Sequence, residues 1–237
     1  MERYNILAVA SGPSEQVKKW KAAAPKRIIP ALIFARSGNV SLDSLREWFR
    51  SGEFAVLGEV VTQYEGLSPN DPSLEPYFAV AEKLDIPVAI HMGLGPPGAA
   101  YYYNQPKYRA GLSNPLLLEE VLLRHPKLRV YVMHAGWPML DEMIHLLYSH
   151  PQLYVDVGVI DWYLPRQEFH HYLRRLVGAG FSKRIMFGSD QMTWPQAIQV
   201  AIDSIASATF LTEEQKRDNF YNNAARFLRL DQRNNEK

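Results

Sequence analysis

The chain has 237 residues, 47% of them hydrophobic and 22% charged, so it is long enough to bury one substantial core. The 26 basic and 25 acidic residues give a net charge of +1, and no basic block is interleaved with aromatic residues, which argues against a nucleic-acid-binding protein. The apolar runs are far shorter than the ~20 residues that cross a bilayer, and the absence of cysteine excludes disulfides, a thiol nucleophile and cysteine zinc sites.

Short apolar runs alternate with amphipathic segments along the chain, and this pattern predicts strands that alternate with helices. Strands are expected at 5–10, 27–35, 54–60, 88–91, 129–134, 153–157 and 184–188. Pro30 has no backbone N–H and is expected to weaken the first half of the second strand. Helices are expected at 16–24, 42–51, 74–84, 116–124, 139–149, 166–179, 196–206 and 212–222.

Buried apolar strands joined by helices indicate a parallel sheet that is covered on both faces. An open doubly wound sheet is disfavoured because no strand is followed by a Gly-x-Gly-x-x-Gly or phosphate-binding loop. We therefore expect an α/β protein with a TIM-like (β/α)8 barrel, of which seven strands are visible. The whole chain, 1–237, is expected to form one domain, with a C-terminal helix at 212–230 and a charged tail at 231–237.

Four of the predicted strands end in a side chain that can bind a metal or transfer a proton. These residues are Glu59, His91, His134 and Asp190. Because the carboxyl ends of the strands meet at one face of a parallel barrel, the four side chains are expected to lie together. Two imidazoles and two carboxylates are a donor set that zinc or manganese accepts, and also one that transfers protons near neutral pH.

The same segments resemble the amidohydrolase superfamily, and within it the branch called amidohydrolase family 2, which contains decarboxylases and lactonases. The resemblance lies in the motifs Gly58-Glu59, Val88–Gly93, His134–Pro138 and Phe187–Asp190, which occur in this order, and in the closing Asn-x-Ala-x-Arg pattern of Asn222–Leu228. It covers nearly the whole chain.

The resemblance implies a distorted (β/α)8 barrel with a divalent metal at its centre, most often zinc, with manganese as the alternative. His91 corresponds to a metal ligand, and His134 to a second ligand or a catalytic electrophile. Asp190 corresponds to a metal ligand and general base, and Glu59 to a position that binds metal in some branches. The catalytic candidates are therefore Asp190 and His134.

One family motif has no counterpart in this chain. Members of the family carry Asp-x-His-x-His on their first strand, whereas the first histidine here is His91. We therefore expect the chain to begin at the second strand of the barrel, with weaker metal binding because the His-x-His pair is absent. Open sheet edges would favour a homodimer.

Further residues near the expected strand ends are candidates for substrate binding. Arg36 could hold a substrate carboxylate or form a salt bridge, and Trp137 could line the pocket. Asp156 or Asp161 could face the substrate. Arg109 and the run Tyr101–Tyr103 lie in a long glycine- and proline-rich segment, 92–113, which is expected to be a binding loop.

The leading hypothesis is a metal-dependent hydrolase that uses metal-activated water on a small carbonyl substrate, an amide, ester or lactone. Three alternatives stay open: a non-oxidative decarboxylase on the same scaffold, a metal-independent lactonase, and a non-catalytic barrel that only binds a ligand or partner. We expect a small-molecule substrate, no nucleic acid or membrane partner, and a cytoplasmic location unless an export signal precedes the chain.

Overall fold

The computed structural model describes residues 1–35, 38, 40–191 and 193–230, so the predicted tail at 231–237 and the candidate Arg36 lie outside the described residues. Within these residues seven strands form one sheet whose strand order follows the sequence. They are β1 (Ala8–Gly12), β2 (Ile28–Phe34), β3 (Val56–Val60), β4 (Val88–His91), β5 (Val130–Met133), β6 (Leu153–Asp156) and β7 (Ile185–Met186). The pairs β1–β2, β2–β3, β3–β4 and β6–β7 are parallel, as the sequence predicts.

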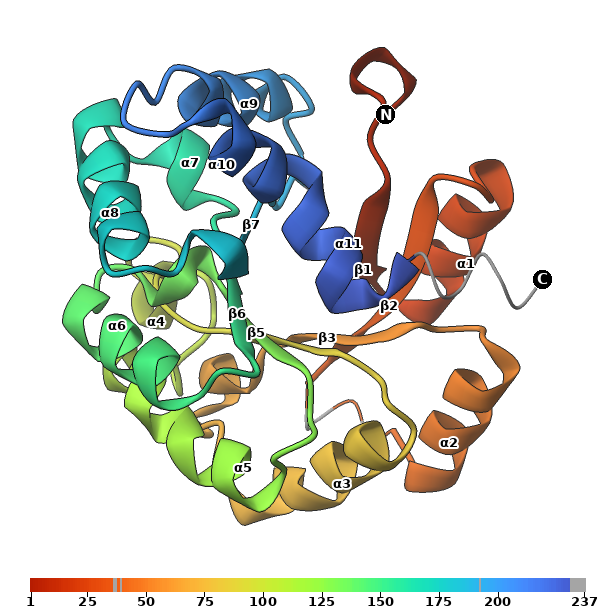
Figure 1. Cartoon of the computed structure of the whole chain (residues 1–237). Helices are drawn as coiled ribbons and strands as arrows, with labels where there is room; N and C mark the ends of the chain where they lie inside the picture. Colours follow the sequence, from red (N-terminus) through yellow and green to blue (C-terminus); the bar gives the residue numbers. More distant parts are fainter. Residues whose placement is uncertain (36–37, 39, 192, 231–237) are drawn as a thin grey trace. The chain divides into compact units, whose positions relative to one another are not determined.

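Helices separate the successive strands, as the alternating pattern predicts (Figure 1). They are α1 (Ser14–Ala23), α2 (Leu42–Ser51), α3 (Glu75–Lys83), α4 (Ala99–Tyr102), α5 (Glu119–Arg124), α6 (Leu140–Ser149), α7 (Ile160–Tyr163), α8 (Arg166–Gly178), α9 (Ala197–Ala206), α10 (Glu213–Arg217) and α11 (Asn223–Leu228). The sequence pattern did not predict α4 and α7, because a single turn of four residues is too short to show a periodicity.

The chain divides into two compact units. The N-terminal unit comprises residues 1–91, 95–113 and 117–130 and contains β1 to β4 and α1 to α5. The C-terminal unit comprises residues 92–94, 114–116 and 131–237. It contains β5 except for its first residue, Val130, and then β6, β7 and α6 to α11.

Helix α2 illustrates how the sequence builds the N-terminal unit. The Ser41 side chain accepts a hydrogen bond from the Ser44 N–H at 3.1 Å and caps the helix, as predicted. Leu45 and Phe49 lie one turn apart and are buried, which places the apolar face of the helix in the core. Gly52 adopts a left-handed conformation (φ 75°) and ends the helix.

Strand β2 corrects one expectation. It runs from Ile28 to Phe34 without a break and pairs with β1 and β3, so the predicted weakening of its first half is wrong. Pro30 lies inside the strand, and its carbonyl accepts a hydrogen bond from the Ala55 N–H at 2.8 Å. The proline therefore takes part in the sheet through its acceptor, although it has no donor.

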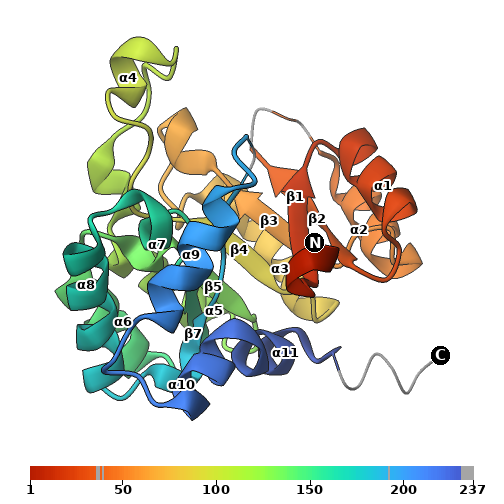
Figure 2. The ribbon, with the colours of Figure 1, turned by 90° about the horizontal axis from the view of Figure 1, so that it is seen from above.

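The segment after β4 is the expected long excursion, but it is not wholly irregular. It contains α4 and a 3-10 turn at Ala110–Ser113, and Figure 2 shows α4 at the far end of the loop. The side chains of Tyr101 and Tyr102 are 85% and 83% exposed.

In the C-terminal unit, the predicted helix at 212–222 is interrupted. Helix α10 begins with a capping box at Thr212, as its sequence suggests, but residues Asp218–Asn222 form a π-turn before α11. The Asn219 carbonyl in this turn accepts a hydrogen bond from the Phe187 N–H at 2.8 Å. The Asn223 amide donates to the carbonyl of Ile185 at 2.7 Å. The turn therefore ties the C-terminal helices to β7.

The described residues include no helix that is both long and apolar enough to span a membrane.

Candidate metal centre

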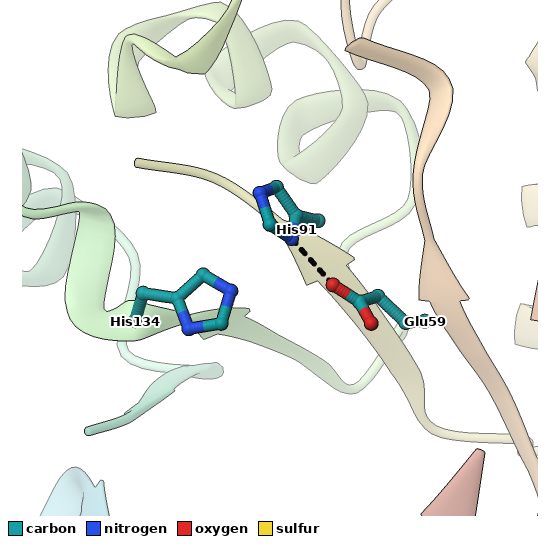
Figure 3. Close-up of side chains that lie close together, drawn as sticks. All are labelled: Glu59, His91 and His134. Atoms are coloured by element: carbon teal, nitrogen blue, oxygen red, sulfur yellow. Dashed lines mark hydrogen bonds and ion pairs between the residues drawn. The ribbon is translucent and has the colours of Figure 1, made fainter. Parts of the chain in front are cut away.

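In the N-terminal unit, Glu59 and His91 meet at the carboxyl ends of neighbouring strands. Glu59 is the last residue but one of β3, and His91 is the last residue of β4. Nδ1 of His91 lies in hydrogen-bonding contact with Oε1 of Glu59 (Figure 3). Both side chains are shielded from solvent, at 7% and 16% exposure for His91 and Glu59. The strand ends converge here as expected for parallel neighbours, and the role of the pair stays a prediction.

The strand before Glu59 leaves no room for a larger residue at position 58. A Cβ added to Gly58 would collide with the Cβ of Ala89, and the backbone there has φ of +158°. The register of β3 shifts between Leu57 and Val60 against both of its neighbours, β2 and β4. The backbone of Gly58 and Glu59 is therefore displaced from the regular ladder at the point where the carboxylate must turn toward His91.

Tyr64 provides the second neighbour of the His91 ring. It lies on a 3-10 turn, Thr62–Glu65, that directly follows β3. Its hydroxyl is 3.3 Å from Nε2 of His91, and the two ring centroids are 5.2 Å apart. Histidines that bind a metal through one ring nitrogen usually hydrogen-bond through the other, which orients the ring. Tyr64 is placed to serve that purpose if Nδ1 binds an ion.

In the C-terminal unit, His134 follows β5 and is 1% exposed. Its Nδ1 lies 2.9 Å from the carbonyl oxygen of Gly158. Because a carbonyl only accepts hydrogen bonds, Nδ1 carries a proton, and in the neutral ring Nε2 is then the nitrogen with the lone pair that a metal ligand requires. The N–H groups of His134 and Gly158 both donate to Oδ1 of Asp156, at 3.1 and 3.0 Å.

Three acids lie close enough in the C-terminal unit to influence one another electrostatically. Burial raises the pKa of the Asp156 carboxyl to about 6, with a further contribution from the charge of Asp190. Burial also raises the pKa of Asp161 well above its ordinary value, and the charge of Asp156 adds to this. Neither carboxyl oxygen of Asp161 has a hydrogen-bond partner among the described residues. Asp156 and Asp161 therefore retain protons at pH values where an exposed aspartate is ionised.

Asp190 lies in the loop after β7, in the same unit as His134. Both residues have a positive φ, 45° for Asp190 and 59° for His134, a conformation that non-glycine residues keep only when their surroundings enforce it. A Cβ added to Gly158 would lie 3.3 Å from the Cβ of Asp190, so the glycine allows the loop to approach. The Trp162 indole N–H donates to the carbonyl of Ser189 at 2.7 Å and holds the residue before Asp190.

Glu59 and His91 in the N-terminal unit each offer one potential ligand atom, and His134 in the C-terminal unit offers another (Figure 3). Asp190, the fourth predicted ligand, is not among the candidate ligands found in the described part of the chain. Two imidazole nitrogens and one carboxylate oxygen are a donor set found at catalytic zinc sites, so the chemistry of these three side chains fits a divalent metal.

The residues predicted to bind substrate lie in different environments. Arg36 lies outside the described residues. The Arg109 guanidinium is exposed and donates to carbonyls of its own loop, Pro106 and Tyr108. The Trp137 indole N–H donates to Glu168 at 3.1 Å, and Asp161 is 1% exposed on α7. Their roles in substrate binding stay predictions.

Three contacts around the candidate ligands are not evident from the sequence. They are those of Ser11 with Glu59, of Tyr64 with His91, and of Trp162 with the residue before Asp190. Tyr64 has the clearest signal in retrospect, because it follows the end of β3 by four residues and an aromatic hydroxyl there can reach the neighbouring strand end. Ser11 lies 48 residues before Glu59 and carries no local signal.

Comparison with known proteins gives a family match over nearly the whole chain. A family model described as amidohydrolase matches residues 8–230. No curated protein matches the chain.

Several solved structures share the fold. The chain resembles an uncharacterized TIM-barrel protein from Bordetella bronchiseptica, with 20% identity, a TM-score of 0.70, and coverage of 91% of this chain and 72% of that chain. It also resembles a probable 2-pyrone-4,6-dicarboxylic acid hydrolase from Acinetobacter baumannii with bound citric acid (14% identity, TM-score 0.68, 96% and 85% coverage). A third match is a dihydroxybenzoic acid decarboxylase from a Polaromonas species with bound manganese and an inhibitor (13% identity, TM-score 0.62, 92% and 74% coverage). These likenesses confirm the predicted TIM-like barrel class.

Proposed function

Since the chain belongs to the amidohydrolase family, we propose that it acts as a metal-dependent enzyme that hydrolyses a small carbonyl substrate, an amide, ester or lactone. The observation that carries this proposal is the contact between Glu59 and His91 at the carboxyl ends of neighbouring strands, with His134 as a further candidate ligand. Zinc is the first expectation for the ion, and manganese is the alternative because it is bound in a similar structure.

A divalent ion bound by these residues would polarise the substrate carbonyl and lower the pKa of a bound water to roughly 7. The protein supplies the orientation and the proton transfer. The hydrogen bond from His134 Nδ1 to the Gly158 carbonyl fixes the ring and leaves Nε2 as the nitrogen available to bind an ion. Asp190 serves as the base that accepts the proton of the attacking water and returns it to the leaving group.

Non-oxidative decarboxylation is the second candidate, and two observations favour it. A similar structure with bound manganese is a dihydroxybenzoic acid decarboxylase. Decarboxylation also requires a proton to replace the lost carboxylate on carbon, and burial raises the pKa of Asp156 to about 6, so this acid keeps its proton to higher pH than an exposed aspartate does. Asp190 or a water would deliver this proton to carbon.

The experiment is an activity screen of the chain loaded with Mn²⁺ or Zn²⁺, with esters, lactones and amides in one panel and hydroxylated aromatic carboxylic acids in the other. We expect turnover in one panel, abolished by a chelator, and lowered about 10²–10⁴-fold in Asp190→Asn, the range expected for loss of general acid–base catalysis. His145→Ala, a substitution on the exposed side of α6, is the matched control and should keep full activity. Turnover that survives complete removal of metal would contradict the proposal.

A further inference from the structure

The backbone that carries Glu59 is held by a side chain from another strand. Ser11 lies near the end of β1, which pairs with β2, and β2 in turn pairs with β3. Its hydroxyl donates to the Gly58 carbonyl at 2.6 Å and accepts a hydrogen bond from the Glu59 N–H at 2.7 Å. The side chain therefore reaches from β1 to the backbone of β3, where it contacts both the C=O and the N–H of the peptide bond between Gly58 and Glu59.

These two backbone groups need such a partner because of the register of β3. The strand shifts register between Leu57 and Val60 against both neighbours, so the intervening peptide does not follow the regular ladder. Buried backbone groups that leave a ladder must find other hydrogen bonds. A serine hydroxyl is one donor and also an acceptor, so Ser11 satisfies the carbonyl and the N–H together.

Packing also limits this part of β3. A Cβ at position 58 would collide with the Cβ of Ala89 on β4, so the Gly58 backbone lies close against that strand. The carboxylate of Glu59 extends from this backbone and contacts His91, which lies two residues after Ala89 on the same strand.

We infer that Ser11 is a positioning residue for the metal centre: its hydroxyl fixes the Gly58–Glu59 backbone and so directs the Glu59 carboxylate toward the ion and His91. This inference rests on the proposed function. Loss of the hydroxyl leaves Glu59 present but less well oriented, and metal affinity falls as it does when other outer-shell partners of metal ligands are removed.

The test measures binding of Mn²⁺ alone to the full chain by calorimetry, for the wild type, Ser11→Ala, Ser11→Thr, Glu59→Gln and Ser41→Ala. We expect Ser11→Ala to weaken binding about 10–100-fold, the range for outer-shell partners. Ser11→Thr keeps the hydroxyl, so its Mn²⁺ affinity should stay within about threefold of the wild-type value. Ser41→Ala removes the cap of α2 and lowers stability without touching Glu59, so it controls for a merely structural loss.

Hydrogen exchange of the Glu59 amide gives a second readout that needs no metal. Its protection should fall in Ser11→Ala and stay unchanged in Ser41→Ala, because the acceptor of that hydrogen bond is the hydroxyl of Ser11 and not that of Ser41. Wild-type binding that Glu59→Gln abolishes but Ser11→Ala leaves within about twofold would overturn this inference alone. A wild type that binds neither Mn²⁺ nor Zn²⁺ would overturn the proposed function and this inference together.

Discussion

The two candidate histidines are held in different ways: side chains contact the ring of His91, whereas a backbone carbonyl holds the ring of His134. In the N-terminal unit, Nδ1 of His91 faces the carboxylate of Glu59, and Nε2 lies 3.3 Å from the hydroxyl of Tyr64. In the C-terminal unit, Nδ1 of His134 donates to the backbone carbonyl of Gly158. The first ring has a charged side chain that can join it as a ligand, whereas the second is fixed by backbone.

The acids of the two units also differ in their burial and in their contacts. The Glu59 side chain is 16% exposed and contacts the imidazole of His91. Asp156 is buried, accepts two backbone hydrogen bonds, and has a pKa raised to about 6 by burial. Asp161 is buried without a hydrogen-bond partner among the described residues. The N-terminal unit therefore pairs a carboxylate with an imidazole, whereas the C-terminal unit has a histidine fixed by backbone and buried acids with raised pKa values.

The largest expected effect concerns His91. His91→Ala should lower Mn²⁺ affinity more than about 100-fold, because losing a ligand should cost more than the roughly 10–100-fold attached to an outer-shell partner. Calorimetry on the wild type and the variant measures this. His145→Ala, an exposed histidine on α6, should bind Mn²⁺ like the wild type. If His91→Ala binds Mn²⁺ as tightly as the wild type does, His91 is not a metal ligand.

The backbone support of His134 predicts a difference between two substitutions of Asp156. Asp156→Ala leaves the buried N–H groups of His134 and Gly158 without their acceptor, which should cost about 2–5 kcal/mol of unfolding free energy. Asp156→Asn keeps an acceptor oxygen and should cost less than half as much. Urea unfolding of both variants checks this, and equal losses would show that the two hydrogen bonds do not hold the His134 turn.

Asp161 predicts a gain in stability that depends on pH. Its pKa is raised in the folded protein, so the folded chain keeps a proton that the unfolded chain releases above about pH 4. Stability of the wild type therefore falls as pH rises through the range between these two pKa values. Asp161→Asn removes this penalty and should raise the unfolding free energy at pH 8 by about 1–3 kcal/mol, with little gain below pH 4.

Unfolding by urea at pH 4 and pH 8 measures this gain for the wild type and the variant. A loss of stability in Asp161→Asn at pH 8 would mean that the ionised carboxylate has a stabilising partner, and the account of a neutral buried acid would be wrong.

The smallest expected effect concerns Tyr64. Tyr64→Phe removes only the hydroxyl that lies 3.3 Å from Nε2 of His91 and keeps the ring. Mn²⁺ binding should weaken a few-fold, below the roughly 10-fold lower end for outer-shell partners, because the contact is long for a hydrogen bond. A loss as large as that of His91→Ala would mean that the hydroxyl is itself a ligand.

The sequence could predict the features that depend on local pattern. Strand β4 has the predicted bounds, 88–91, and the capping residues Ser41 and Thr212 act as expected because each contacts a backbone group three residues away. The positions of Glu59, His91, His134 and Asp190 at strand ends also follow from pattern, since each ends an apolar run.

The support around these residues depends on contacts between distant segments, which a single sequence does not reveal. Ser11 contacts a peptide 47 and 48 residues away, and the need for this contact arises from a register shift in β3. The π-turn at 218–222 likewise forms where Asn219 contacts Phe187. The expectation for Pro30 is wrong because propensity does not show which of its backbone groups the sheet uses.

The most direct test of the metal centre is the metal content of the purified, folded chain after incubation with Mn²⁺ or Zn²⁺ and removal of the excess. Elemental analysis should find about one ion per chain for the wild type and for His145→Ala, the number expected for one metal site. The ion should be lost in His91→Ala and in His134→Ala. A folded wild type without metal, or metal retained in both variants, would contradict the account.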